Sequence, residues 1–316
     1  MSQPAPLFIL APPRSFTSVI CGMIGQHPQM LGLPEVNLFA ADNYAGLNEG
    51  IYKLRPGFRH GLLRAIAQIG LGEQSAQNVD AAFGYLEDNR ELSSGDVFKD
   101  LVAWADPKRL VDKSPIYVYT EAPLRRIAEA FPDAAFLHLT RHPRGTCESV
   151  FKLREKVQGA MARFRGGAGG AGANPPMMRS APNNRLAEVE DPDSMWLAPH
   201  KRILAFLSQI PPERRRWYRG EDFMAAPEEH LREVARWLDV DDSDEAIGEM
   251  MHPEHSPFAC LGPPNARFGN DPSFMESPVL RPYTPPDISL DGPLAGGDDV
   301  ELSDALKDVA RGFGYS

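Results

Sequence analysis

The sequence predicts an α/β fold in which a short central parallel sheet is flanked by helices. Two segments carry this prediction, because in each a fully apolar run is followed by a short loop and then by a run with helical spacing. A strand that is apolar on both faces is typical of a parallel sheet covered by helices on both sides.

The first of these units lies near the N-terminus. Residues 6–13 (PLFILAPP) form an apolar strand that ends in a turn at two prolines. In residues 17–26 apolar side chains recur at helical spacing, and His27 and Pro28 then end the helix. The predicted order is strand, tight loop and helix.

The second unit repeats this order. Residues 134–139 are a predicted strand, residues 140–145 a loop, and residues 146–157 a helix with one apolar face. Between the two units, residues 48–131 are predicted to be mainly helical. The exception is a short strand in residues 109–115 (RLVDKSP), which ends in a loop.

The rest of the chain adds elements to what we expect to be one domain spanning residues 1–316. Residues 198–210 carry an apolar helical stripe, and residues 227–238 open with a proline and two glutamates, as a helix N-terminus prefers. Between these helices, residues 215–219 (RRWYR) are the strand candidate.

Two segments are predicted to be irregular. A glycine-rich insertion at about residues 163–185 has few apolar side chains to bury, so we expect a flexible loop there and hypothesise that it closes over a substrate. From about residue 252 the chain is rich in Pro, Gly and Asp, and this loop-rich segment is expected to wrap the surface.

The composition excludes several classes of protein. Hydrophobic residues are 42% and charged residues 24%, as in folded globular chains. No apolar run approaches the roughly 18 residues that a transmembrane helix needs, and no signal sequence is evident, so a cytoplasmic location is expected. A net charge of −10 disfavours nucleic-acid binding, so any anionic ligand must meet a local basic site.

The loop between the first strand and the first helix is a candidate anion site. Backbone N–H groups at this place, together with the positive end of the helix dipole, favour an anion. The hydroxyls of Ser15, Thr17 and Ser18 can add donors, and Arg14 supplies positive charge. The alternative is a Ser/Thr helix cap behind a proline turn. The pattern GxxxxGK[ST] of P-loop NTPases is absent.

The second unit places another basic group at the same edge of the sheet. Arg141 follows a strand end, and Ser149 lies eight residues further on, within the next helix. In open α/β sheets ligands bind outside the carboxyl ends of the strands, where both loops are predicted to lie. Two such loops indicate a ligand with two separated phosphates.

These motifs resemble a known family. PPRSFTS followed by FLHLTRHPRGTCES is similar to the 5′-phosphosulfate loop and the 3′-phosphate motif of sulfotransferases that use 3′-phosphoadenosine 5′-phosphosulfate (PAPS). LPEVN, VDKSP and GEDF with PEEHLREVARWLDV follow in the order of the bacterial carrier-protein and tyrosylprotein-like branch. The likeness covers most of residues 6–240 and weakly residues 269–274. It implies a P-loop-like sulfotransferase fold.

The resemblance also implies roles for the two loops. The backbone from Arg14 to Ser18, with Phe16 at its centre, would hold the 5′-phosphosulfate. Arg141 and Ser149 would hold the 3′-phosphate, which distinguishes PAPS and its product 3′,5′-ADP from ATP. A guanidinium group suits this recognition because it can bind phosphate in a bidentate manner.

Glu35 and Lys113 are the candidate reactive groups. By analogy with the family, Glu35 would be the general base that takes the acceptor hydroxyl proton. Lys113 and Arg14 would stabilise the charge that develops on the departing 3′,5′-ADP. The alternatives are a solvated loop glutamate and a surface lysine paired with Asp112. No carboxylate pair or histidine cluster indicates a metal ion, so transfer without a metal is expected.

Two residues depart from the family pattern. Phe16 stands where many relatives have Gly, so a backbone angle that Gly permits must here suit an aromatic residue. Gly220 replaces the Tyr of the common RYEDL motif.

The function expected from these residues is sulfuryl transfer from PAPS to an acceptor hydroxyl. The acceptor classes left open are a lipid, a carrier-protein-bound acyl chain, a sugar and a small metabolite. A nucleotide kinase or other NTPase-like enzyme is one alternative, and a non-catalytic nucleotide-binding module is the other.

Overall fold

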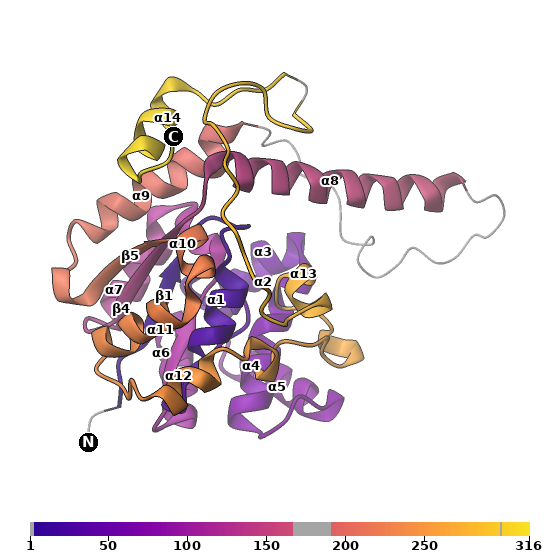
Figure 1. Cartoon of the computed structure of the whole chain (residues 1–316). Coiled ribbons are helices and arrows are strands. Elements are labelled where there is room, and N and C mark those ends of the chain that lie inside the picture. Colours follow the sequence, from indigo (N-terminus) through magenta and orange to yellow (C-terminus); the bar gives the residue numbers. More distant parts are fainter. Residues whose placement is uncertain (1–2, 167–190, 298) are drawn as a thin grey trace.

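The computed structural model describes residues 3–166, 191–297 and 299–316 (Figure 1). It contains a five-stranded parallel sheet in the order β2-β3-β1-β4-β5, which confirms the predicted fold class. The strands are β1 (Leu7–Leu10), β2 (Met30–Gly32), β3 (Arg109–Asp112), β4 (Ala135–Thr140) and β5 (Arg215–Arg219).

Strand β1 occupies the centre of the sheet. Leu7 pairs with Val111 of β3 on one side and with Ala135 of β4 on the other. Because the strands are parallel, the loops that follow them leave from one edge of the sheet. Strand β2 was not predicted, since three residues are too few to show a period, and its pairing with β3 defines it.

Helices surround this sheet. Their bounds are α1 (Thr17–Ile24), α2 (Tyr44–Glu49), α3 (Ile51–Leu54), α4 (His60–Gly70), α5 (Ala76–Asp88), α6 (Ser94–Ala105), α7 (Glu121–Ala130), α8 (Pro143–Gly166), α9 (Ala198–Leu207), α10 (Gly220–Ala225), α11 (Pro227–Trp237), α12 (Asp244–Met250), α13 (Pro272–Glu276) and α14 (Asp304–Gly312). Short 3-10 turns relevant to the site are η1 (Leu38–Ala40), η2 (Pro56–Arg59), η3 (Pro115–Val118) and η6 (Pro253–His255).

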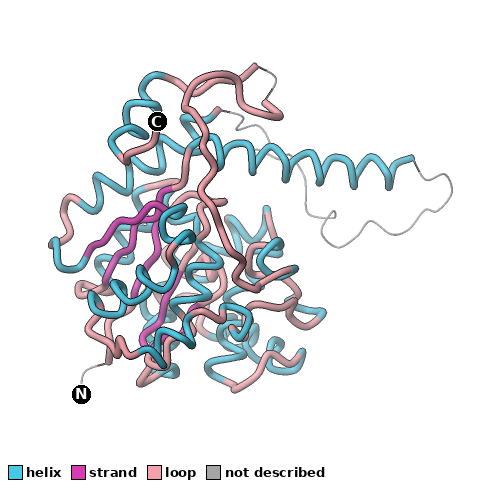
Figure 2. Tube along the Cα trace, in the orientation of Figure 1, coloured by secondary structure: helices cyan, strands magenta, loops and turns pink. Residues whose placement is uncertain are grey.

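The side chains of β1 alternate between two apolar clusters. Phe8 and Leu10 pack into a cluster to which α4, α5, α6 and α7 contribute. Leu7 and Ile9 pack into the other cluster, together with residues of α1, α11 and α12. Figure 2 shows the strands as a magenta layer between these helices. Burial on both faces explains why the strand has no polar residue.

Helix α8 is longer than expected. It begins at Pro143 rather than at residue 146, because proline suits the first turn of a helix. It continues to Gly166, so the first residues of the predicted glycine-rich loop are helical. The rest of that predicted loop, up to residue 185, lies outside the described residues, as does the hypothesis that it closes over a substrate.

The C-terminal segment contains two helices that were not predicted, α13 and α14. Helix α14 packs in a third apolar cluster in which Trp196 and Phe313 take part. From α13 the chain runs as a long loop past the carboxyl edge of the sheet to α14 (Figure 1). No helix in the described part of the chain is both long and apolar enough to cross a membrane.

Candidate active site

The loop between β1 and α1 turns through two residues in the left-handed conformation, Arg14 (φ 68°) and Phe16 (φ 61°). Ser15 and Thr17 are buried beside them. The N–H groups of residues 15–18 donate to no acceptor within the described chain, and the buried hydroxyl of Ser15 has no partner there either. The loop therefore presents free donors at the N-terminus of α1, as an anion site requires.

The aromatic ring of Phe16 lies against Gly220 at the start of α10. A Cβ atom on Gly220 would stand 2.6 Å from Cδ2 of Phe16. The Arg141 guanidinium lies over the Phe16 ring, 4.6 Å from its centroid. The Tyr283 ring packs edge to face against Phe16, with the ring centroids 5.4 Å apart. Tyr283 belongs to the C-terminal segment, and no pattern in the sequence predicts this contact.

Arg14, Arg141 and Ser149 come together at the carboxyl edge of the sheet. Arg141 donates from Nη1 to the backbone carbonyl of Arg14 at 2.6 Å, and Arg14 donates from Nε to the Ser149 hydroxyl at 3.0 Å. Arg14 also forms an ion pair with Asp271, the N-cap of α13. Burial lowers the pKa of the Arg141 guanidinium, so a bound anion would stabilise its charged form.

Lys113 joins the loop to Glu35. Its Nζ atom donates to Ser18 Oγ and to Glu35 Oε1, both at 2.8 Å. The Lys113 side chain is 1% exposed, whereas that of Glu35 is 28% exposed. Lys113 is therefore a buried cation paired with Glu35, and the alternative of a surface lysine paired with Asp112 is wrong. Glu35 lies at the boundary between this buried cation and solvent.

The backbone of Glu35 is held on both sides. Its N–H donates to the carbonyl of Gly269 at 2.7 Å, and its carbonyl accepts from the Asn37 side chain at 3.2 Å. Asn37 is left-handed (φ 54°), and its side chain also donates to the Phe58 carbonyl at 3.2 Å. A Cβ atom on Gly61 would stand 2.0 Å from the Glu35 carbonyl oxygen, so α4 approaches this backbone closely.

Asp112 supports the same region from the end of β3. Its carboxylate accepts from Ser114 Oγ at 3.1 Å and from the Tyr117 hydroxyl at 3.0 Å. Ser114 in turn accepts from the backbone N–H of Asn37 at 3.0 Å. Burial raises the pKa of Asp112 to about 7. The sequence named Asp112 only as an alternative partner of Lys113, and it did not single out Asn37, whose partners Phe58 and Ser114 lie far away along the chain.

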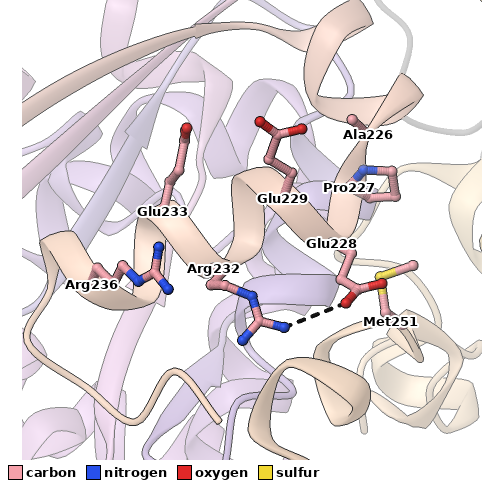
Figure 3. A pocket seen from close by; sticks show the side chains of 8 residues that line it. All are labelled: Ala226, Pro227, Glu228, Glu229, Arg232, Glu233, Arg236 and Met251. Carbon is pink, nitrogen blue, oxygen red and sulfur yellow. Dashed lines mark hydrogen bonds and ion pairs between the residues drawn. The ribbon is translucent and has the colours of Figure 1, made fainter. Parts of the chain in front are cut away.

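Two other features use none of the predicted site residues. A groove of about 640 Å³ runs along α11 and is lined largely by charged side chains, among them Glu229, Glu233 and Arg232 (Figure 3). At turn η6, potential metal-ligating atoms of His252, Glu254 and His255 lie within 4.8 Å of one another, although the sequence was expected to contain no histidine cluster.

The fold is that of an α/β enzyme that binds its ligand at the carboxyl edge of the sheet, where a loop of free backbone donors, Arg141 and the Lys113–Glu35 pair lie. A model of the sulfotransferase family matches residues 6–244, and the chain belongs to this family. It is therefore a sulfotransferase, which confirms the predicted family and enzyme class.

Solved structures of sulfotransferase domains have the same fold. One is a domain from the curacin biosynthetic pathway, with a TM-score of 0.71 and 22% identity over 100% of this chain and 99% of that one. Another is from the Synechococcus PCC 7002 olefin synthase, with a TM-score of 0.70 and 22% identity over 100% of this chain and 97% of that one. The comparison with curated proteins gives no match.

Proposed function

We propose that the protein transfers the sulfuryl group of PAPS to an acceptor hydroxyl and releases 3′,5′-ADP. One observation carries this proposal: Lys113 Nζ lies 2.8 Å from both Ser18 Oγ and Glu35 Oε1. A single buried cation thereby connects the anion loop to a partly exposed carboxylate. The sulfuryl group, the charge that develops on the leaving group and the proton of the acceptor hydroxyl would all lie close to Lys113.

The residues at the sheet edge fit PAPS. The free N–H groups of residues 15–18 and the unpartnered Ser15 hydroxyl suit the 5′-phosphosulfate. Arg141 and Ser149, both in contact with Arg14, suit the 3′-phosphate. When bound, PAPS supplies an activated sulfuryl group on a phosphate leaving group.

The chain's own residues have separate roles in the transfer. As the acceptor oxygen bonds to sulfur, Glu35 takes the hydroxyl proton, and general bases of this kind contribute about 10²–10⁴-fold. The bond from sulfur to the 5′-phosphate oxygen breaks, and its electron pair stays on that oxygen. Lys113 and Arg14 stabilise the negative charge that develops there.

An apolar pocket supports a lipid or a carrier-protein-bound acyl chain as acceptor. The pocket measures about 220 Å³ and is lined by η1, α2, α3, η3 and the start of α7, including Leu47, Ile51 and Ile116. Turn η1 follows Glu35 along the chain, and turn η3 follows Lys113. The pocket therefore lies beyond the ends of the strands that carry the proposed reactive groups.

Thermal unfolding without ligand, with 3′,5′-ADP and with ATP tests the nucleotide site. A ligand at 100 times its Kd stabilises the fold by about 2.7 kcal/mol. We expect 3′,5′-ADP to raise Tm and ATP to have little effect. Stabilisation by ATP alone would favour the kinase or NTPase alternative.

The Glu35→Gln variant tests the base. It should retain 3′,5′-ADP binding and lose transfer of labelled sulfate from PAPS in an acceptor screen. Glu228→Gln, at an exposed position on α11, is the matched control and should keep full activity. Full activity of Glu35→Gln would reject Glu35 as the base.

A further inference from the structure

Arg55 and Arg59 flank the turn that leads into α4. Neither guanidinium pairs with a carboxylate or donates a hydrogen bond within the described chain, and the buried Nε atom of Arg59 has no partner. Their contacts are with aromatic rings, Arg55 over Phe58 at 5.4 Å and Arg59 over Tyr52 at 5.7 Å. Two partly buried cations are thus left without an anion.

Arg64, in contrast, has hydrogen-bond partners within the protein. Arg64, on the next turns of α4, is fully buried and donates to the carbonyls of Cys260 and Phe268 at 2.9 and 3.1 Å. Buried cations in proteins are ordinarily satisfied in this way. Arg55 and Arg59 are only partly buried and lack such partners in the described chain, so their donors are open to an anionic ligand.

The two arginines are tied to the segment that carries Glu35. The Tyr52 hydroxyl, whose ring lies under Arg59, donates to the Val36 carbonyl at 3.4 Å. The carbonyl of Phe58, whose ring lies under Arg55, accepts from Asn37 at 3.2 Å. Both contacts therefore reach the residues directly after Glu35, on the proposed acceptor side of the site.

The local electrostatics agree with this position. Burial lowers the pKa of Arg55, and no nearby anion opposes the shift. Burial, Arg59 and Arg64 together lower the pKa of His60 to about 4, so this imidazole is neutral at pH 7 and adds no further charge. A negatively charged group bound here would recover the Coulomb energy that the two arginines lack.

We propose that Arg55 and Arg59 bind an acidic group of the acceptor, a phosphate or a carboxylate, and so orient its hydroxyl toward Glu35. This inference rests on the proposed function, since it assigns the acceptor to the Glu35 side of the nucleotide loop. It narrows the acceptor to an anionic molecule with an apolar part. Each guanidinium suits this role because it offers several donors in a fixed plane.

Calorimetric titration of the full chain saturated with 3′,5′-ADP tests the subsite. The probes are butyl phosphate, butyrate and neutral 1-butanol, at constant ionic strength. We expect the wild type to bind at least one of the two anions and not 1-butanol, and the tighter anion identifies the acidic group. Arg55→Ala and Arg59→Ala should each weaken that binding by about 10–100-fold, as expected for a charge-assisted hydrogen bond.

Two variants serve as controls. Arg59→Lys keeps the charge and the long side chain, and should lose less affinity than Arg59→Ala. Arg125→Ala removes an exposed arginine that pairs with Glu129 on α7, and should leave anion binding unchanged.

Either failure of anion binding by the wild type or an equal loss in Arg125→Ala would overturn the inference. The titration is repeated without nucleotide, so that a failure of the anion subsite can be distinguished from a failure of the proposed function. Normal stabilisation by 3′,5′-ADP without anion binding rejects only the subsite. Anion binding that depends on Arg55 and Arg59, in a protein that 3′,5′-ADP does not stabilise, rejects only the nucleotide assignment.

Discussion

The ring of Phe16 fills the space that a side chain at Gly220 would need. A Cβ atom at residue 220 would stand 2.6 Å from Phe16 Cδ2 and 3.1 Å from the Thr140 carbonyl oxygen. The two departures from the related motifs, an aromatic residue in the anion loop and a glycine at the start of α10, are therefore one steric arrangement. The loop keeps its left-handed turn at Phe16 because Gly220 makes room for the ring.

This arrangement predicts strong coupling between the two positions. Gly220→Ala should destabilise the protein by about 1–3 kcal/mol, as overpacking does, and should weaken 3′,5′-ADP binding by displacing the loop. Adding Phe16→Gly should relieve both effects, since glycine also adopts a positive φ without strain. Chemical denaturation of the four proteins gives the coupling energy, and additive effects would contradict the steric link.

Lys113 should be required for turnover. Lys113→Met removes the charge between Ser18 and Glu35, and we expect kcat to fall about 10²–10³-fold, the usual cost of losing one transition-state donor. The measurement is sulfate transfer from labelled PAPS, with 3′,5′-ADP binding followed in parallel. Lys99→Met, at an exposed residue paired with Asp96, is the control. Wild-type turnover in Lys113→Met would show that this cation has no part in the reaction.

Asn37 should act as a positioning residue for Glu35. Asn37→Gly permits the positive φ but removes the hydrogen bonds to the Glu35 and Phe58 carbonyls, so kcat should fall about 10–100-fold with little change in the KM for PAPS. Asp239→Gly, at another left-handed residue, is the matched control and should be fully active. Equal changes in kcat for the two variants would assign Asn37 a structural role only.

Asp271 should compete with the nucleotide for Arg14. Asp271→Asn keeps the oxygen that caps α13 at Ser273 and Phe274 but removes the charge that neutralises Arg14. Affinity for 3′,5′-ADP should rise about 2–5-fold, which corresponds to the ~0.5–1 kcal/mol of a partly exposed ion pair. Calorimetry at two salt concentrations measures this change, and a weaker affinity would mean that Asp271 helps to hold the nucleotide.

Stability should depend on pH through the buried pair His138 and His200, which lie 2.8 Å apart (Nε2 to Nδ1). Burial lowers the pKa of His138 to about 3 and that of His200 well below 6.5. The unfolded chain therefore binds more protons just below pH 6.5, so the stabilisation is complete above this pH and is lost as the pH falls.

The His200→Gln variant measures the contribution of one of these two imidazoles to the pH dependence. The variant should reduce the slope of the unfolding free energy between pH 6 and 4 by up to about 1.4 kcal/mol per pH unit, the value for one proton. Asp112 changes the unfolding free energy in the opposite direction. Its pKa is raised to about 7, so the stability that its protonated form contributes is lost as the pH rises from 3.8 to 7. Asp112 has this effect in the wild type and in His200→Gln alike, so the difference in slope between the two proteins reports on His200. An unchanged slope would contradict the assignment to His200.

The sequence alone determined the class of fold and the position of the two loops proposed to bind the nucleotide. Residues 7–10 and 135–140 are apolar throughout, and this local pattern suffices to predict buried parallel strands. The loops after them carry their basic and hydroxyl residues next to those strands, so their meeting at one sheet edge follows from parallel order. The three-residue strand β2 is too short to show a period, and the short helices α10, α12 and α13 and the C-terminal helix α14 were not predicted either.

The tertiary structure decided how the site residues pair. Lys113 and Glu35 are 78 positions apart, and Arg14 and Asp271 are 257 apart, so no local period relates them. Sequence could name Lys113 as a candidate but assigned its alternative partner to the adjacent Asp112. In the structure, Lys113 is buried at the end of β3 and pairs with the Glu35 carboxylate across the sheet edge. This pairing is required because an unpaired buried charge is costly.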